Sequence, residues 1–379
     1  MTAPVYLDYN ASTPLAPEVV RAMLPYLEEA YGNPSSLHWA GLPARDAIEV
    51  ARSQVATLLC CDATEIVFTS GGTEANNHAI KGLFFSRRAS GRPFHVITSG
   101  IEHPAILEPC RFIEELGAEI TRLPVDRFGL VDPDDIRHAI RPSTALISVM
   151  YANNEVGTIQ PITEIARIAH EHGVLCHTDA AQTVGKIETD VESLGVDLLS
   201  VAGHKLYGPN GVGALFVREG VTLDSILHGA GHEAGRRAGT ENVLQIVGLG
   251  AACERAQDWI DDTTIRQLRD DFWQRLQQCF GERIVLNGHP EFRLPNTLNV
   301  SFVGERGHEL LARLPNLAAS TGSACHAGSL HISPVLAAMG VPHDVGLGAV
   351  RFSLGRQTTP VEVAWVVEAL GRIVGRVAV

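Results

Sequence analysis

Helical patterns alternate with short apolar runs along most of this chain, from about residue 17 to residue 255. The runs at 66–69, 95–98, 145–150 and 213–217 are rich in β-branched residues and show no polar alternation. Runs of this kind indicate strands buried on both faces, and helices between them indicate crossover connections. The sequence therefore predicts an α/β fold, with a mostly parallel sheet flanked by helices and ligands bound at the carboxyl ends of the strands.

The pattern changes after about residue 241. A helical stretch over 241–281 is followed by apolar runs at 297–302 and 350–353, with helical patterns near 307–314, near 333–340 and from Pro360. Shorter strands mixed with helices are typical of an α+β unit. We predict a large domain over 15–255, and a smaller α+β domain built from 1–14 and 256–379.

The overall charge and the cysteine usage narrow the class of protein. A net charge of −13 argues against nucleic acid or an anionic membrane as a main partner. No apolar stretch approaches the ~20 residues that cross a bilayer, and the N-terminus has no signal-peptide pattern. The seven cysteines form no paired framework and no C-x-x-C motif, so we expect free thiols, no metal site and a cytoplasmic location.

A lysine and an aspartate follow two of the predicted strands. Asp179 ends the run 174–178, and Lys205 comes shortly after the run 197–201. Each residue alone is compatible with a solvated loop lysine or a helix cap. Together, a strand-end amine and carboxylate are what pyridoxal phosphate requires, because the amine binds its aldehyde and the carboxylate keeps its ring nitrogen protonated.

Further polar groups follow other strands. The glycine-rich segment 70–77 opens a helix after the strand 66–69, so Gly72 and Thr73 are candidates to bind a phosphate group; a plain turn capped by Thr73 is the alternative. The Walker and dinucleotide patterns are absent. His103 is a candidate for stacking on a ring and moving protons, or else a surface histidine. Asn154 is a candidate for binding a cofactor oxygen or a substrate carboxylate.

The C-terminal part adds a cysteine and an arginine. Cys325 lies in the small-residue segment 319–328, which suits a thiol that must be exposed and mobile. Arg351 lies in an apolar strand pattern, where a guanidinium group is costly unless it is paired. Arg351 is therefore the better candidate, ahead of Arg356, for binding a carboxylate.

Nearly the whole chain resembles the cysteine desulfurase family, within the class V aminotransferase-like group of fold type I pyridoxal-phosphate enzymes. The resemblance rests on eleven blocks in the family's order, at residues 6–14, 32–36, 69–77, 102–103, 153–155, 177–182, 203–209, 237–242, 295–299, 322–325 and 351–356. It implies removal of sulfur from L-cysteine, giving L-alanine and a persulfide on Cys325. It also implies a homodimer and a sulfur-acceptor protein, such as an iron–sulfur cluster scaffold or a thiolation enzyme.

The resemblance also implies roles for single residues. Lys205 binds the cofactor covalently, His103 stacks on its ring and Cys325 accepts the sulfur atom. Asp179 binds the ring nitrogen of the cofactor, and Gln182 binds its phenolic oxygen. The phosphate group is bound by Gly72, Thr73, His204 and, from the other subunit, Thr240. The substrate carboxylate is bound by Asn154 and Arg351.

One position departs from the family pattern, and two other functions stay open. The family commonly has serine three residues before the lysine, whereas this chain has Ala202, so one phosphate hydrogen bond, typically worth ~1 kcal/mol, is in doubt. Selenocysteine lyase shares nearly all these residues. A sulfur-carrier or interaction protein without catalysis is the other alternative, which bound cofactor would exclude.

Overall fold

A seven-stranded sheet forms the centre of the larger part of the molecule. The computed structural model describes residues 4–88, 91, 93–260, 262–322 and 331–376. The strand order is β2-β8-β7-β6-β5-β3-β4, and β8 alone runs antiparallel to its neighbours. The strands are β2 (Ile66–Thr69), β3 (His95–Ser99), β4 (Glu119–Leu123), β5 (Thr144–Ser148), β6 (Leu175–Asp179), β7 (Leu198–Ala202) and β8 (Gly213–Val217). The expected α/β fold with a mostly parallel sheet is confirmed.

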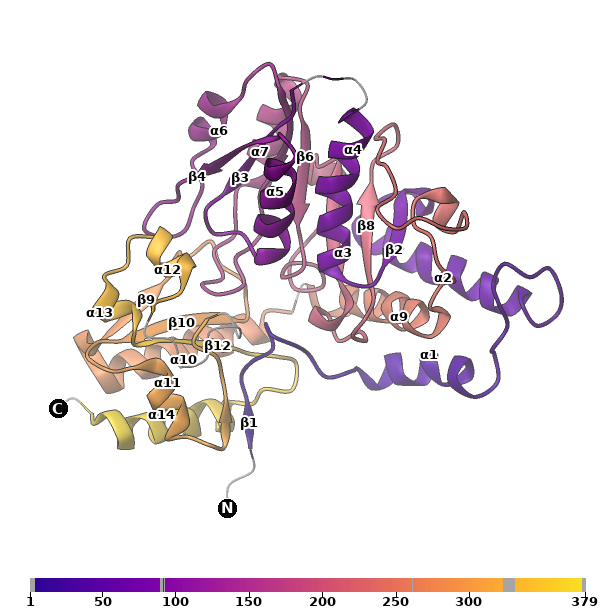
Figure 1. Cartoon of the computed structure of the whole chain (residues 1–379). Helices are drawn as coiled ribbons and strands as arrows, with labels where there is room; N and C mark the ends of the chain where they lie inside the picture. Colours follow the sequence, from indigo (N-terminus) through magenta and orange to yellow (C-terminus); the bar gives the residue numbers. More distant parts are fainter. Residues whose placement is uncertain (1–3, 89–90, 92, 261, 323–330, 377–379) are drawn as a thin grey trace.

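Helices cover both faces of this sheet (Figure 1). One face carries α3 (Gly72–Asn77), its π-helical continuation (His78–Gly82), α4 (Leu83–Arg88) and α5 (Pro104–Glu115). The other face carries α2 (Leu42–Leu59), α6 (Pro133–Ala139), α7 (Ile162–Glu171), α8 (Val191–Leu194) and α9 (Val243–Ile260), with α1 (Pro17–Glu28) packed on α9.

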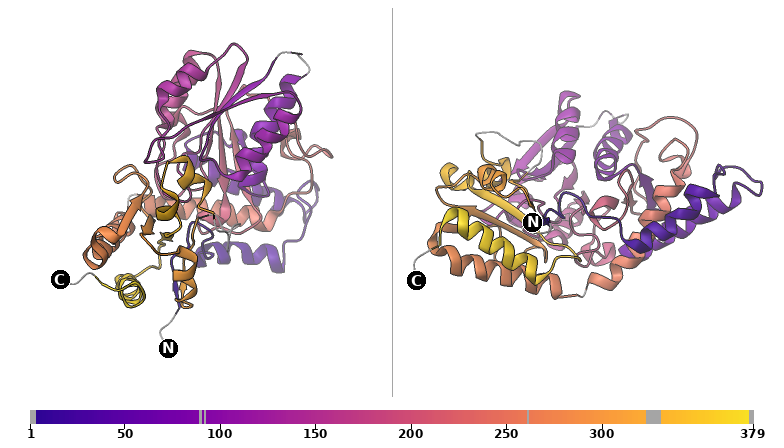
Figure 2. Two further views of the ribbon diagram at one scale, coloured as in Figure 1. Left: turned by 60° about the vertical axis from the view of Figure 1, so that its left-hand side comes forward. Right: turned by 90° about the horizontal axis from the view of Figure 1, so that it is seen from below.

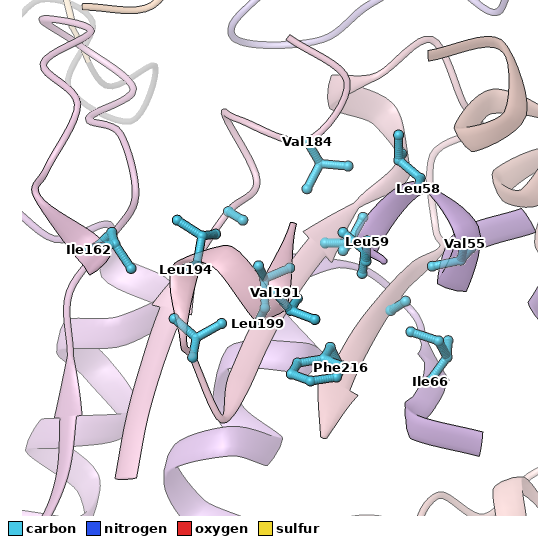
Figure 3. Packing of buried hydrophobic residues seen from close by; sticks show 14 of the residues in the cluster. Val55, Leu58, Leu59, Ile66, Ile162, Val184, Val191, Leu194, Leu199 and Phe216 are labelled. Carbon is cyan, nitrogen blue, oxygen red and sulfur yellow. The ribbon is translucent and has the colours of Figure 1, made fainter. Parts of the chain in front are cut away.

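The strands divide their side chains between these two layers. Ile66 and Phe68 of β2 join the cluster under α2 and α9, whereas Val67 joins the cluster under α3 and α5. Figure 3 shows the first cluster, in which Leu59 of α2 approaches Phe216 of β8. Burial on both faces explains why these strands read as unbroken apolar runs.

A smaller antiparallel sheet lies beside the large one (Figures 1 and 2). Its order is β12-β10-β9, from β9 (Ile284–Asn287), β10 (Thr297–Phe302) and β12 (Ala349–Ser353), and β1 (Val5–Tyr6) pairs with β11 (Leu317–Ala318) nearby. The helices of this part are α10 (Thr264–Phe280), α11 (Gly307–Ala312), α12 (Pro334–Ala338), α13 (His343–Gly346) and α14 (Pro360–Val374).

Hydrophobic packing places α9 and α10 in two different cores. One core extends to Ala256 of α9, and the other begins at Leu268 of α10 and takes in Val5 and Leu7 from the N-terminus. The single helical stretch expected over 241–281 is therefore wrong, since two helices with different packing partners occupy it. We propose that the domains meet between α9 and α10, a few residues beyond the expected position. No helix in the described ranges is long and apolar enough to cross a membrane.

Candidate active site

The predicted pair of strand ends lies at one edge of the large sheet. Asp179 is the last residue of β6, and Lys205 ends a 3₁₀ turn (Gly203–Lys205) that directly follows β7. Because β6 and β7 are parallel neighbours, with Asp179 opposite Ser200, their carboxyl ends emerge together. The charge of Asp179 acts on the pKa of Lys205, so the two groups face a common space.

The carboxylate of Asp179 is buried and held on both oxygens. Asn76 of α3 donates its amide Nδ2–H to Oδ2 at 2.7 Å, and the backbone N–H of Ala181 donates to Oδ1 at 3.0 Å. Both donors are neutral groups, and together they fix the orientation of the carboxylate at the base of the site.

The amine of Lys205 is desolvated and surrounded by backbone oxygens. Its Nζ donates to the carbonyls of Asn10 and Ala11, both at 2.7 Å. The pKa of Lys205 is lowered to about 8, chiefly by burial and then by the Arg351 charge, while Asp8 and Asp179 act in the opposite direction. An amine of this kind loses its proton readily near neutral pH, as a nucleophile or a base must.

His103 stands at the N-terminus of α5, next to these groups. Its Nδ1 accepts a hydrogen bond from the backbone N–H of Ala105 at 3.1 Å, so the neutral ring carries its proton on Nε2. The ring is open to solvent on part of its surface. Even so, desolvation lowers the pKa of His103, opposed by Asp179 and reinforced by Lys205. The imidazole is therefore neutral and able to exchange protons.

The glycine-rich segment forms an open cradle before α3. Gly71 has a φ of +145°, and a Cβ added there would meet nothing within 4 Å. Thr73 is exposed, and its hydroxyl has no partner within the described part of the chain. A Cβ at Gly72 would lie 3.2 Å from the Cβ of Ala202, so the position of the missing serine borders this cradle directly.

His204 lies on the same side, next to Lys205. The pKa of His204 is lowered to about 4, chiefly by burial and also by the charges of Lys205 and Lys186. The imidazole is therefore neutral at physiological pH. It can give a phosphate group a hydrogen bond but no positive charge.

Arg351 reaches the site from β12 of the small sheet. Its Nη2 forms an ion pair with Asp8 at 2.8 Å, and its Nη1 donates to the backbone oxygen of Asn154 at 2.9 Å. The two residues expected to bind a carboxylate are therefore in contact, although Asn154 contributes its backbone rather than its side chain. The buried Nε of Arg351 has no partner among the described residues.

The structure brings most, but not all, of the predicted residues together. Gln182 is buried beside Lys205, and both donate to the backbone oxygen of Asn10. Thr240 is exposed, and no contact joins it to this group within the described ranges. Cys325 lies outside the described residues.

The sequence reasoning assigned no role to several residues that organise the site, namely Asp8, Asn10, Asn76 and Lys186. Asn10 and Asn76 belong to matching sequence blocks, but an asparagine in a loop or helix start carries no signal of its partner. Three or more histidine, cysteine, aspartate or glutamate side chains gather nowhere in the described ranges in a way that could hold a metal ion.

Comparisons with known proteins agree with this geometry. A family model described as aminotransferase class-V matches residues 5–366. The chain is 49% identical to a cysteine desulfurase IscS of Dictyoglomus turgidum over 99% of this chain and 95% of that protein. A solved NifS-like protein superimposes with a TM-score of 0.91 at 36% identity, covering 98% of this chain and 99% of the other.

A second solved structure shows the protein SspA in complex with cysteine. It is 39% identical to this chain with a TM-score of 0.83, covering 93% of this chain and 99% of that one. Matches of this extent and identity show common descent over the whole fold. The chain belongs to the class V aminotransferase family, and within it to the group of the cysteine desulfurases.

Proposed function

We propose that this protein is a pyridoxal-phosphate-dependent cysteine desulfurase that releases L-alanine and keeps the sulfur atom of L-cysteine as a persulfide. The observation that carries the proposal is the convergence of the Lys205 amine and the Asp179 carboxylate at neighbouring strand ends. The relatives named cysteine desulfurase, and the relative solved with cysteine, support the same substrate.

The residues present suit the cofactor. The carboxylate of Asp179 would hold the ring nitrogen, and the cradle at Gly71 and Gly72 has room for a phosphate group. The unpartnered hydroxyl of Thr73 and the neutral ring of His204 would donate hydrogen bonds to that phosphate. When bound, the cofactor supplies an aldehyde that links covalently to amines and a ring that accepts electrons from the attached carbon.

Two groups of the chain would carry the protons. The amine of Lys205, with its pKa of about 8, is sufficiently basic to take the proton from the substrate Cα once it is free. The neutral imidazole of His103 would exchange protons at its second nitrogen while Nδ1 remains bound to the Ala105 N–H. The Asp179 carboxylate is held in place by the amide of Asn76.

Arg351 would bind the substrate carboxylate. Its guanidinium group already pairs with the carboxylate of Asp8, and its buried Nε–H has no partner among the described residues. A substrate carboxylate would satisfy this donor in an almost fully buried position, where charge-assisted hydrogen bonds are strongest.

The sulfur transfer would take place on Cys325. Its thiolate would attack the sulfur atom of the substrate, and the carbon–sulfur bond would break. The electron pair of that bond would pass to the carbon, which is then protonated to give alanine. The persulfide left on Cys325 would then pass its outer sulfur atom to an acceptor protein, such as an iron–sulfur scaffold or a thiolation enzyme.

We further propose a homodimer. The loop between α1 and α2 exposes large apolar side chains, with Tyr31 83% and Trp39 79% exposed. This segment lies at the opposite end of the molecule from α14 (Figure 2), and exposed apolar clusters of this kind mark protein–protein contacts. Thr240, exposed in this chain, would then serve the phosphate of the neighbouring subunit.

Incubation with L-cysteine and a thiol reductant tests the proposed reaction. We expect alanine and sulfide in equal amounts, and no sulfide without cysteine. Absence of both products from protein that has been supplied with pyridoxal phosphate would contradict the proposed function.

A further inference from the structure

A second lysine lies beside the proposed cofactor site and has no role in the mechanism above. Lys186 follows β6, and protein encloses its ammonium group. Its Nζ donates to Gln182 Oε1 at 2.8 Å and to Asn10 Oδ1 at 3.1 Å. No carboxylate pairs with it within the described residues. An enclosed ammonium group without a counter-ion is costly, so its contacts require a reason.

The contacts of Lys186 fix the orientation of the Gln182 amide. Lys186 donates to the amide oxygen, while the amide Nε2–H donates to the backbone oxygen of Asn10 at 3.0 Å. A carbonyl only accepts hydrogen bonds, and an ammonium group only donates them. A flipped amide would therefore lose both contacts, and the nitrogen of Gln182 is held toward Asn10 and Lys205.

Asn10, the second partner of Lys186, connects this lysine to the rest of the site. Its Nδ2 donates to Thr297 Oγ1 at 2.8 Å and to the Asn154 backbone oxygen at 3.2 Å. Its Oδ1 accepts from Asn296 as well as from Lys186. Its backbone oxygen accepts from Lys205 and Gln182. Lys186 thus joins Gln182 to a network that also holds the anchoring amine.

The Gln182 nitrogen has a second proton, which no acceptor takes up within the described residues. We propose that Lys186 is a positioning residue, which holds the Gln182 amide so that this second N–H is available to the phenolic oxygen of the cofactor. The inference rests on the proposed function and deepens it, because it assigns the orientation of a cofactor contact to a residue that does not touch the reacting atoms.

The charges around Lys186 determine what its removal would do. Lys205 and Arg351 are the cations that act on it, Asp8 and Asp179 lie close to Lys205, and His204 responds to Lys186. Loss of Lys186 would free the amide and remove a positive charge. Both changes disfavour the ionised phenolic oxygen, so the pH midpoint of the bound cofactor's absorbance change should rise.

A double-mutant cycle with pyridoxal phosphate as the probe tests the proposal. The variants are Lys186→Met, Lys186→Arg, Gln182→Ala and Lys186→Met with Gln182→Ala. We expect Lys186→Met to raise the absorbance midpoint by about one pH unit and to weaken cofactor binding about tenfold. Lys186→Arg, which keeps the donors and the charge, should recover most of both changes.

The Gln182→Ala background separates positioning from charge, because partners that act as a unit are not additive. We expect Lys186→Met to shift the midpoint there by less than about a third of its effect in the wild type. An equal shift in both backgrounds, or no shift at all, would overturn the proposal.

Two controls keep the outcome interpretable. Thermal unfolding without cofactor shows whether Lys186→Met is folded, and Lys186→Gln, which can donate and accept, replaces it in the cycle if it is not. A wild-type protein that binds cofactor and yields alanine, combined with an unchanged Lys186 variant, would contradict this inference alone. A wild type without either property would contradict the proposed function.

Discussion

The floor of the proposed site, around Asp179 and Lys205, differs from its outer rim, where Thr73 lies. They differ in how many hydrogen-bond partners a single chain supplies. On the floor, the Asp179 carboxylate and the Lys205 amine have two hydrogen-bond partners each. On the rim, Thr73 is exposed; Thr240 and the large apolar side chains near Trp39, which belong to other segments, also face solvent. The floor is organised before any ligand arrives, whereas the rim has groups that a cofactor or a second subunit would satisfy.

Removing the floor's amine should have the largest effect. Lys205→Ala should abolish covalent cofactor attachment and alanine formation, because the other amine near the site, that of Lys186, is held by Gln182 and Asn10. The chain has only three lysines, so Lys81→Ala is a matched control on the helical layer over the sheet. Absorbance spectra and alanine assays measure both. Covalent attachment that persists in Lys205→Ala would contradict the claim that Lys205 binds the cofactor.

Removing the sulfur acceptor tests whether the floor alone supports turnover. Cys325→Ser should keep the cofactor colour and lose sulfide release, since a hydroxyl group cannot accept the sulfur atom as a thiolate does. Cys60→Ser alters another cysteine, which is exposed in the structure, and serves as the control. Normal sulfide release by Cys325→Ser would contradict the role given to this thiol.

Replacing His103, the proposed proton carrier beside Lys205, should lower kcat strongly, but less than the loss of Lys205 or Cys325 does. His103→Gln should lower kcat about 10²- to 10⁴-fold, the usual contribution of a positioned acid–base group, while the cofactor stays bound. His138→Gln changes an exposed histidine on α6 and should have no effect. A His103→Gln variant with wild-type kcat would leave Lys205 as the only proton carrier.

A charged residue in the exposed loop between α1 and α2 tests the proposed dimer. Trp39→Glu should weaken association by about 2 kcal/mol or more, as loss of a buried aromatic at an interface does, and should lower cofactor affinity through Thr240. Sedimentation velocity and cofactor titration measure the two effects. Val361→Glu on α14, where Val361 is also exposed, should change neither. A monomeric wild-type protein would contradict the proposed dimer and the proposed role of Thr240 in the neighbouring subunit.

The last prediction is a pH dependence of stability without cofactor. The pKa of Lys205 is about 8 in the folded protein, below the ordinary value of lysine. Between these values the unfolded chain binds one proton more than the folded protein, so this group's contribution to stability rises with pH. Urea unfolding of wild type and Lys205→Met should show their difference changing by up to about 3 kcal/mol from pH 7.5 to pH 10.5. A constant difference would contradict the desolvated amine.

The sequence pattern predicted strands that are buried throughout and missed a strand whose burial is partial. β2, β8 and β10 lie at the predicted residues because their side chains are buried throughout. β4, at the edge of the sheet, was not predicted, since Glu119 and Arg122 interrupt its apolar character and its burial is partial. Edge strands often carry charges because one side lacks a partner, so no apolar run marks β4, whereas β2 at the opposite edge is apolar and buried.

The site followed from the sequence only where topology decided it. Strand order places Asp179 next to Lys205, and parallel strands require that their ends meet. The partners Asn10 and Asn76 come from distant segments, and polar contacts between such segments leave no periodic signal; Lys186 is only four residues from Gln182, but a single lysine there does not show its partner. The roles of Gln182 and Thr240 came from resemblance alone, and they remain predictions.

The most direct test of the account is to identify the lysine that carries the cofactor. Borohydride reduction of the protein loaded with pyridoxal phosphate, followed by peptide mass spectrometry, distinguishes Lys205 from Lys81 and Lys186. The account predicts a phosphopyridoxyl group on Lys205 alone in the wild type. A label on Lys186 or Lys81, or an unlabelled Lys205, would contradict the claim that this amine and the Asp179 carboxylate hold one cofactor between them.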